Sequence, residues 1–223
     1  MDTTFESVIV NKPWGYEYLC YRNPNLAIWL LFLAHDQETS LHCHPKKNTG
    51  LFVVSGEVKV SFLRGSTTLI SPSKINIMRA RFHSTKATSP QGAFVLEIEA
   101  PEDKDDLVRI EDKYGRAHTA YEDERFHFEK PEHYHWFSDP VANPEIQTLH
   151  GLNFRHLLLA NGSQLESVPI QNFYVFTDGG LQASKGELIV APGDILDATT
   201  LNRLMEHFDF KKNTSLIEIS PKN

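Results

Sequence analysis

The stretch Ser40-Leu41-His42-Cys43-His44-Pro45-Lys46-Lys47 holds two histidines one residue apart, and a third, His83, follows two β-rich stretches and a turn at Pro72. In an extended strand alternate side chains point to the same face. His42 and His44 would therefore project together and could chelate one metal ion, with Cys43 facing away. A barrel would bring His83 back to the same point. The sequence therefore predicts a metal site made of His42, His44 and His83.

Bulk properties exclude several classes of partner. The chain has 223 residues and a net charge of −7, from 22 Lys and Arg against 29 Asp and Glu. Such a charge argues against a nucleic-acid partner held by general positive charge. Cys20 and Cys43 fit a reducing compartment better than a disulfide scaffold. The first residues do not resemble a signal peptide, and the longest apolar run, Leu26 to Ala34, is too short to cross a bilayer. We expect a cytoplasmic protein with no membrane partner.

Strand signals dominate the first half of the chain. Residues 26–33 are rich in β-formers, 51–62 read as two strands meeting at Gly56, and 94–99 alternate between polar and apolar side chains. Turn residues separate these segments at 64–66, 71–73 and 89–92. Many short strands with regular turns predict an all-β fold, a barrel of the jelly-roll type.

A weak internal repeat suggests two such barrels in tandem. Phe52-Val53-Val54-Ser55-Gly56 is echoed by residues 174–179, and Leu96-Glu97-Ile98 by residues 216–218. We assign 1–116 to a first barrel with the metal site, and 117–223 to a connector and a degenerate second barrel. The alignment places Gln164 and Glu166 at the positions of His42 and His44, and Arg203 at that of His83. An arginine cannot replace a metal-binding imidazole, so the second barrel is expected to be structural or adapted to another ligand.

The histidine motifs resemble those of the cupin superfamily. The cupin pattern has a first motif with His-x-His, an acidic ligand four or five residues on and a closing glycine, and a second motif with a proline turn followed by histidine. Here Asn48 or Thr49 stands where the acidic ligand belongs. The resemblance implies a β-barrel holding one divalent metal, Zn, Fe, Mn or Ni, on His42, His44 and His83.

A finer resemblance lies in Asn11-Lys12-Pro13-Trp14-Gly15-Tyr16-Glu17 and in Lys47 shortly after the His-x-His. These features are similar to the mannose-6-phosphate isomerase-type cupins of sugar-nucleotide pathways. The resemblance implies isomerase chemistry on a sugar phosphate. Because cupins host many unrelated activities, the fold alone does not decide the function.

Glu97 and Glu99 share one face of the last predicted strand of the first barrel. If that face is inward, either could act as the general base, because proton abstraction beside a carbonyl needs a carboxylate within reach. On the alternative interpretation the pair is solvated and Leu96 and Ile98 face the core.

Cationic side chains flank the ligand segments and would suit an anionic substrate. Lys47, Arg79 and Arg81 are the candidates, and by parity both arginines share a strand face with His83. Ordinary solvated surface charge is the alternative. Trp14 is a candidate for the mouth of a sugar site, or packs beneath the N-terminal strand. The cluster of His127, His133 and His135 is predicted to be a surface or oligomer-contact segment.

Two functions follow from these features. One is a metal-dependent isomerase-type enzyme acting on a sugar phosphate or a related anionic carbohydrate, with a three-His ferrous dioxygenase as a variant. The other is a non-catalytic sugar- or effector-binding cupin that serves polysaccharide or sugar-nucleotide biosynthesis. Exposed sheet edges make a homodimer the expected assembly.

Overall fold

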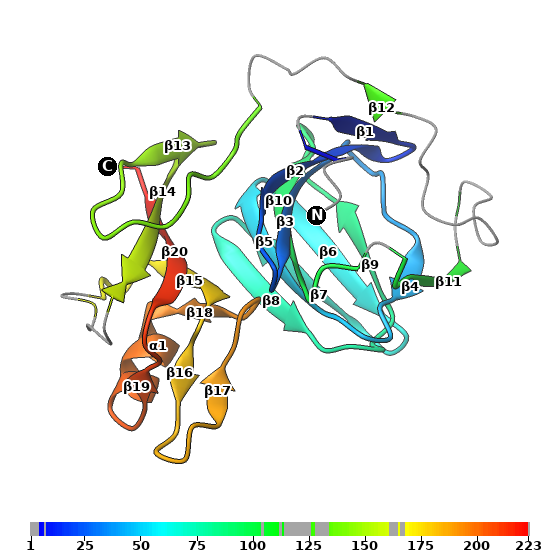
Figure 1. Cartoon of the computed structure of the whole chain (residues 1–223). Coiled ribbons are helices and arrows are strands. Elements are labelled where there is room, and N and C mark those ends of the chain that lie inside the picture. The colour runs from blue at the N-terminus through cyan, green and yellow to red at the C-terminus, as the bar shows by residue number, and fades with distance from the viewer. Residues whose placement is uncertain are drawn as a thin grey trace. The chain divides into compact units, whose positions relative to one another are not determined.

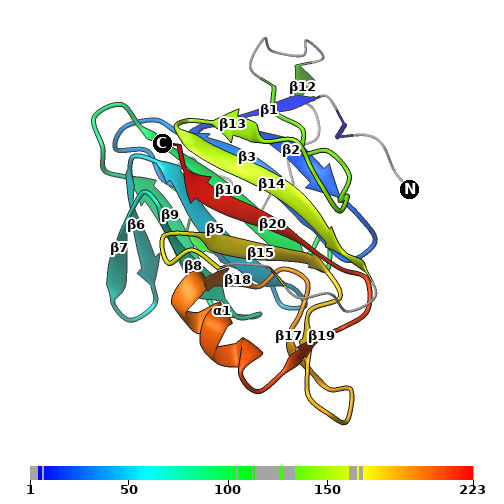
Figure 2. The same ribbon diagram turned by 90° about the vertical axis from the view of Figure 1, so that its left-hand side faces the viewer.

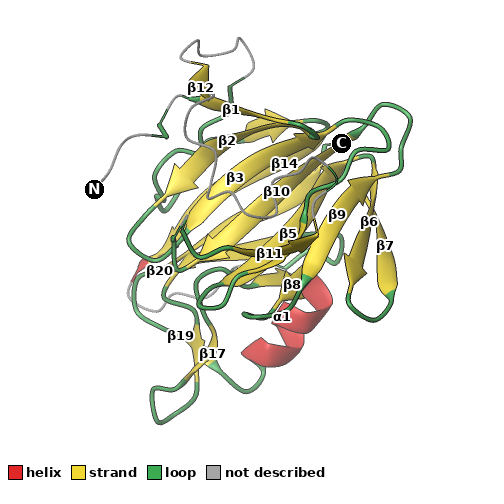
Figure 3. Ribbon diagram, turned by 90° about the vertical axis from the view of Figure 1, so that its right-hand side faces the viewer, coloured by secondary structure: helices red, strands yellow, loops and turns green. Residues whose placement is uncertain are grey.

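The computed structural model describes residues 5–6, 8–103, 105–111, 113, 134–160, 165 and 168–222, and the backbone of 126–127. The chain divides into two compact units, Met1–Trp136 and Phe137–Asn223, a later division than the one predicted after residue 116. Strands dominate both units (Figures 1 and 3), and the described residues contain one α-helix. No helix among these residues has the length and apolar character needed to cross a membrane.

Two antiparallel sheets form the first unit. One runs through β12 (Phe126–His127), β1 (Ile9–Lys12), β2 (Gly15–Arg22), β3 (Ala27–Leu33), β10 (Ala93–Ala100), β5 (Asn48–Ser55) and β8 (Ser73–Ile77). The other runs through β11 (Val108–Glu111), β4 (Leu41–Cys43), β9 (His83–Ala87), β6 (Glu57–Phe62) and β7 (Ser66–Ile70). The eight strands from β3 to β10 thus pair as β3-β10-β5-β8 and β4-β9-β6-β7, which is the order of an eight-stranded jelly roll. The predicted all-β jelly-roll fold is confirmed for this unit.

The core lies between the two sheets, because alternate residues of each strand face inward. Its members come from both sheets and include Leu31, Leu51, Val53, Val58, Val60, Ala87 and Val95. The inward face of β10 changes character along the strand. Ala93 and Val95 belong to the apolar core, whereas Glu97 and Glu99 line a cavity. The same strand therefore supports the core at one end and supplies carboxylates at the other.

Gly56 forms the predicted turn between β5 and β6. Its φ is +82°, and a Cβ there would lie 2.5 Å from Ser89 Oγ, so the turn requires glycine for both conformation and space. Just before this turn the pairing of β10 with β5 shifts: Phe94 lies opposite Ser55, and Val95 lies opposite Val53. Val54 is thus an extra residue in β5, a β-bulge that sets the register of the rest of the pair.

The charged segment after β10 contributes a strand to the first unit. Val108–Glu111 form β11, which pairs with β4 so that Arg109 lies opposite His42. Asp106, just before this strand, is buried. The first half of the charged segment therefore belongs to the barrel and lies beside the histidine motif.

The second unit contains two sheets, one larger than the other (Figure 2). The larger runs through β13 (Gln147–Leu149), β14 (Leu152–Leu159), β20 (Thr214–Pro221), β15 (Phe173–Asp178) and β18 (Ile195–Asp197), and the smaller through β17 (Leu188–Val190), β16 (Leu181–Gln182) and β19 (Asp209–Phe210). Helix α1 (Ala198–Met205) follows β18, and its N-cap Asp197 accepts a bond from Thr200 N at 2.8 Å.

The larger sheet repeats an order found in the first unit. The strand order β13-β14-β20-β15-β18 has the same pattern as β2-β3-β10-β5-β8. In each sheet a later strand, β10 or β20, lies between an earlier one, β3 or β14, and the strand that precedes a glycine turn, β5 or β15. Arg203 lies on α1 and is exposed, so it occupies no strand position like that of His83. Gln164 and Glu166 fall outside the described residues. That the second unit is a degenerate barrel stays a prediction.

Candidate metal centre

Three imidazoles meet at one end of the first barrel. His42 lies in β4, His44 follows that strand, and His83 opens β9 directly opposite His42 in register. The ring centroids are 4.6 Å apart for His42 and His83, 4.9 Å for His42 and His44, and 5.6 Å for His44 and His83. Alternation of side chains along this segment thus brings His42 and His44 together, and the pairing of β4 with β9 adds His83.

Each of the three rings is oriented by a backbone carbonyl. The Nδ1 atoms of His42, His44 and His83 lie 2.7, 2.7 and 3.0 Å from the carbonyl oxygens of Ser40, Asp106 and Arg81. A carbonyl only accepts, so Nδ1 carries the proton in each ring and Nε2 keeps its lone pair. Within the described chain, the buried Nε2 atoms of His44 and His83 have no hydrogen-bond partner. This arrangement is typical of metal-ligating histidines.

Burial keeps the three rings neutral. It lowers the pKa of His44 to about 4, and the nearby Lys47 ammonium acts in the same direction. Burial also holds the pKa of His42 well below its ordinary value, reinforced by His83, and lowers that of His83. Protonated imidazole cannot bind a metal, so the centre is poised for a cation at neutral pH.

Glu97 joins the histidines as a candidate fourth ligand. One carboxylate oxygen of Glu97 and one nitrogen from each of His42, His44 and His83 all lie within 4.8 Å of one another. Thr49, at the sequence position of the usual acidic ligand, is buried, and its hydroxyl has no hydrogen-bond partner among the described residues. Thr49 lies opposite Glu99 on the neighbouring strand, and Leu51 lies opposite Glu97. A carboxylate of β10 thus lies near the histidines, although the first motif lacks one.

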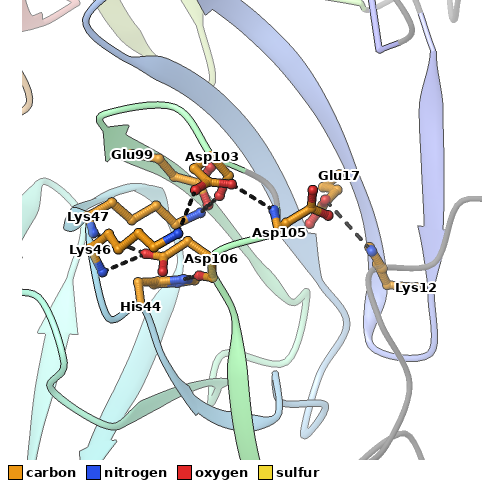
Figure 4. Close-up of polar contacts among 9 residues, drawn as sticks. All are labelled: Lys12, Glu17, His44, Lys46, Lys47, Glu99, Asp103, Asp105 and Asp106. Carbon is orange, nitrogen blue, oxygen red and sulfur yellow. Dashed lines mark hydrogen bonds and ion pairs between the residues drawn. The ribbon is translucent and has the colours of Figure 1, made fainter.

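A buried ion pair lies beside this cluster (Figure 4). Lys47 Nζ is 2.8 Å from Glu99 Oε1 and 2.9 Å from the carbonyl oxygen of Asp103. The Lys47 and Glu99 side chains are only 1% and 3% exposed. Both glutamates of β10 therefore face the cavity, as one of the two interpretations of the sequence required. Leu96 and Ile98 are buried on the opposite face of the strand.

Asp106 fastens the segment that follows His44 (Figure 4). Its Oδ2 accepts from the backbone N–H groups of Lys46 at 2.8 Å and Lys47 at 3.0 Å, while its carbonyl accepts from His44 Nδ1. One residue thus holds both the backbone and the ring of the His-x-His motif. Nothing in the sequence around Asp106 signalled this role, because its partners are main-chain groups distant along the chain.

A cavity of about 70 Å³ opens onto the cluster. Its lining includes the two histidines of β4 and its following turn, three acidic side chains and three basic ones: Glu17, Glu97, Glu99, Lys12, Lys47 and Arg109. Lys12 Nζ lies 3.8 Å from Glu17 Oε1. Trp14 also lines the cavity and is buried, and its role toward a sugar stays a prediction. Glu17 and Arg109 were not predicted from the sequence to line the site.

The predicted placement of Arg79 and Arg81 is wrong. β8 ends at Ile77 and β9 begins at His83, so the residues between them form a turn and the parity argument fails. Ala80 has a φ of +61°, and its N–H donates to the carbonyl of His44 at 2.7 Å. Both arginines are exposed and neither lines the cavity; Arg81 instead lies 4.2 Å from the centroid of the Phe62 ring.

The second histidine cluster falls largely outside the described residues. His133 is not described, and of His127 only the backbone in β12 is. The backbone N–H of His135 donates to Tyr18 OH at 3.3 Å, and the neighbouring Tyr134 hydroxyl donates to the carbonyl of Leu19 at 2.6 Å. These bonds attach the segment to β2 of the same unit.

The chemistry of the cluster fits a divalent metal. Three imidazole nitrogens and one carboxylate oxygen are ligands that zinc, iron, manganese and nickel share. The orphaned Nε2 atoms of His44 and His83 are the strongest sign of fit, because a buried acceptor without a partner is costly.

No family model matches the chain, and no curated protein matches it. Solved structures are similar over part of its length. KdgF from Halomonas sp. is 17% identical, with a TM-score of 0.40, over 42% of this chain and 86% of that one. An RmlC-like cupin from Shewanella frigidimarina is 18% identical, with a TM-score of 0.40, over 44% and 86%. The capsular polysaccharide assembling protein CapF from Staphylococcus aureus is 15% identical, with a TM-score of 0.42, over 47% and 34%.

Proposed function

We propose that the chain is a metal-dependent enzyme that moves a proton beside a carbonyl group in a small anionic carbohydrate. One observation carries this proposal: three imidazoles, each fixed by a carbonyl at Nδ1, and Glu97 gather their ligand atoms within 4.8 Å beside the buried Lys47–Glu99 pair. A divalent ion held there would polarise a carbonyl or enediolate oxygen as a Lewis acid.

The charges of the cavity favour an anionic substrate. Three basic and three acidic side chains line it and balance one another. A divalent cation would then leave the site with a net positive charge. Such a site stabilises negative charge that develops on oxygen more than it stabilises a neutral ground state. A sugar phosphate or a related acid is therefore the substrate class that we propose.

Glu99 and Lys47 are proposed as the proton-transfer pair. Glu97 lies among the metal ligands, which leaves Glu99 as the carboxylate of β10 for acid–base work. Lys47 engages Oε1 of Glu99, so we assign the transferred proton to Oε2. The Lys47 ammonium holds the Glu99 carboxylate in place, and its own position is fixed by the carbonyl of Asp103.

The size of the cavity limits how much of a substrate it receives. A volume of about 70 Å³ holds several waters, each of which needs about 10–15 Å³. The common range for ligand pockets begins near ~300 Å³. We therefore propose that only the reactive carbonyl end of the carbohydrate enters, while the anionic group stays toward Lys12 and Arg109 at the lining.

Elemental analysis of the purified chain tests the metal, with His42→Ala/His83→Ala and Glu97→Gln beside the wild type. We expect near one equivalent of Zn, Fe, Mn or Ni, loss in the double variant, and at least about tenfold weaker binding in Glu97→Gln. Aldose and ketose phosphates are then incubated in deuterated water. Exchange of the proton next to the carbonyl, lost in Glu99→Gln with metal retained, supports the enzyme. Full metal without exchange on any substrate contradicts it.

The small cavity also favours a second candidate, a non-catalytic binding cupin in which the metal centre only stabilises the barrel. Such a protein would be stabilised by metal against thermal unfolding and would bind a ligand. It would show no proton exchange in the deuterium experiment. The two candidates are therefore separated by the same measurement.

A further inference from the structure

A second cavity lies wholly within the second unit, at the end of its larger sheet (Figure 2 shows β14, β20 and β15 side by side). Its volume is about 310 Å³, within the ~300–1,000 Å³ range of small-molecule pockets. Its lining combines amide, guanidinium and carboxylate groups with apolar ones: Asn153, Arg155, Asn172, Glu218, Pro169 and Pro221.

Glu218 forms the fixed centre of this cavity. Its Oε1 accepts from Asn172 Nδ2 at 2.9 Å and from the Tyr174 hydroxyl at 3.4 Å. Its Oε2 accepts from two nitrogens of the Arg155 guanidinium, Nε at 2.7 Å and Nη2. With four donors on two oxygens, this carboxylate is satisfied. It acts as an anchor that positions Asn172 and Arg155 and leaves little capacity to bind a metal or accept a proton.

Asn172 carries the unsatisfied group of the cavity. The residue is 4% exposed, and its Oδ1 has no hydrogen-bond partner among the residues that the structure describes. A buried acceptor left without a donor costs about 1–3 kcal/mol, which a ligand hydroxyl would recover. Arg155, whose side chain is 45% exposed, keeps N–H groups beyond the two bound to Glu218. The lining of the cavity thus includes one acceptor without a partner and N–H donors with spare capacity.

The register explains why this cavity differs from the metal centre. Glu97 of β10 lies between Trp29 of β3 and Leu51 of β5. Glu218 of β20 lies in the same way between Arg155 of β14 and Tyr174 of β15. The second unit therefore places a glutamate at the corresponding strand position but surrounds it with donors. The carboxylate proposed as a metal ligand in the first unit thus corresponds to one that is bonded to Arg155, Asn172 and Tyr174 in the second.

We propose that this cavity binds one ring of an uncharged sugar or polyol. Arg155 and Glu218 cancel each other's charge, so neither an anion nor a cation gains net attraction. Asn172 Oδ1 requires a donor and the Arg155 N–H groups require an acceptor. A pair of adjacent hydroxyls supplies both, because each hydroxyl donates and accepts. Pro169 and Pro221 provide apolar surface for the carbon face of the ring.

Ligand-observed NMR on the full chain tests the site with glucose, mannose, galactose and rhamnose as neutral probes and glucose 6-phosphate and glucuronate as anionic ones. We expect at least one neutral sugar to bind saturably, with a Kd on the order of 1 mM. Asn172→Ala should weaken it about tenfold, the loss of ~1.4 kcal/mol. His42→Ala/His83→Ala should leave it unchanged.

A second pair of variants tests the cavity independently of Asn172→Ala, which could lose binding because it misfolds. Gln171 lines the cavity and is exposed, so Gln171→Trp should fold and obstruct the entrance. Ser184→Trp, at an exposed turn outside the cavity, is the matched control and should bind normally. Binding that survives Gln171→Trp, binding lost in the double histidine variant, stronger binding of the anionic probes, or no saturable binding of any neutral probe overturns the proposal.

Discussion

Lys47 and Glu99 form a contact of 2.8 Å between Nζ and Oε1, and both side chains are almost fully buried. They come from the segment after the His-x-His motif and from β10. A buried pair of this kind gives little net stability when intact, since both charges lose their hydration. Removing one partner leaves the other charge uncompensated.

Lys47→Met should therefore destabilise the first unit by about 3–5 kcal/mol, the usual cost of leaving a buried charge unpaired. Urea unfolding followed by tryptophan fluorescence measures this effect. The double variant Lys47→Met/Glu99→Gln removes both charges and should regain part of the loss. Equal destabilisation in the single and double variants would mean that packing, not charge, dominates at this site.

Asp106→Ala should weaken metal binding by about 10–100-fold without abolishing folding, because it frees the backbone of Lys46 and Lys47 and loosens the carbonyl that orients His44. Asp105→Asn is the matched control: its side chain is exposed, and its contact with Asp103, at 3.1 Å, comes from the backbone N–H, which the substitution keeps. Competition with a fluorescent zinc chelator measures both affinities. If the two variants bind zinc with the same affinity, the bonds from Asp106 to Lys46, Lys47 and His44 do not contribute to metal binding.

Metal affinity should hold as the pH falls from 7 to about 5 and decline only toward pH 4. Protons compete with the metal for Nε2, and that competition begins near the pKa of the free ligand, which burial lowers to about 4 for His44. The synthetic peptide of residues 40–47 is the control. Its histidines are solvated, so it should lose metal near the ordinary histidine pKa of about 6.5. A protein curve that follows the peptide would refute the assigned burial.

The second unit should lose stability in acid through His156. Its Nδ1 donates to the carbonyl of Ser138 at 2.7 Å, its Nε2 accepts from Thr177 Oγ1 at 2.9 Å, and burial lowers its pKa to about 4. Between pH 6.5 and 4 the unfolded chain binds a proton that the native ring refuses. The free energy of unfolding therefore decreases as the pH falls from 6.5 to 4, by up to about 1.4 kcal/mol per pH unit. Above pH 6.5 the contribution of His156 is complete.

His156→Gln should flatten this acid slope by one proton when the urea midpoint is measured against pH. His207→Gln, at an exposed side chain of the same unit, is the matched comparison. Identical slopes in the two variants would show that burial of His156 does not generate the dependence.

Local patterns predicted the strands of the first barrel and the meeting of His42, His44 and His83, because alternation and turn chemistry act over a few residues. They did not identify Glu97 as a fourth ligand. Its place beside the histidines depends on pairing between β10 and β5, which no local signal encodes. Asp106 escaped notice because it binds main-chain N–H groups. Arg79 and Arg81 were misplaced because the turn at Ala80 contains neither glycine nor proline.

The bulge at Val54 gives the metal centre a weakness remote from its ligands. Side chains alternate along β10, so a one-residue slip in its pairing would turn Glu97 and Glu99 outward and bring Leu96 and Ile98 to face the histidines. A single-residue deletion in β5 could thus silence the centre while every ligand remained in the sequence. A chain can lose this chemistry by a change in length alone, with no ligand substituted.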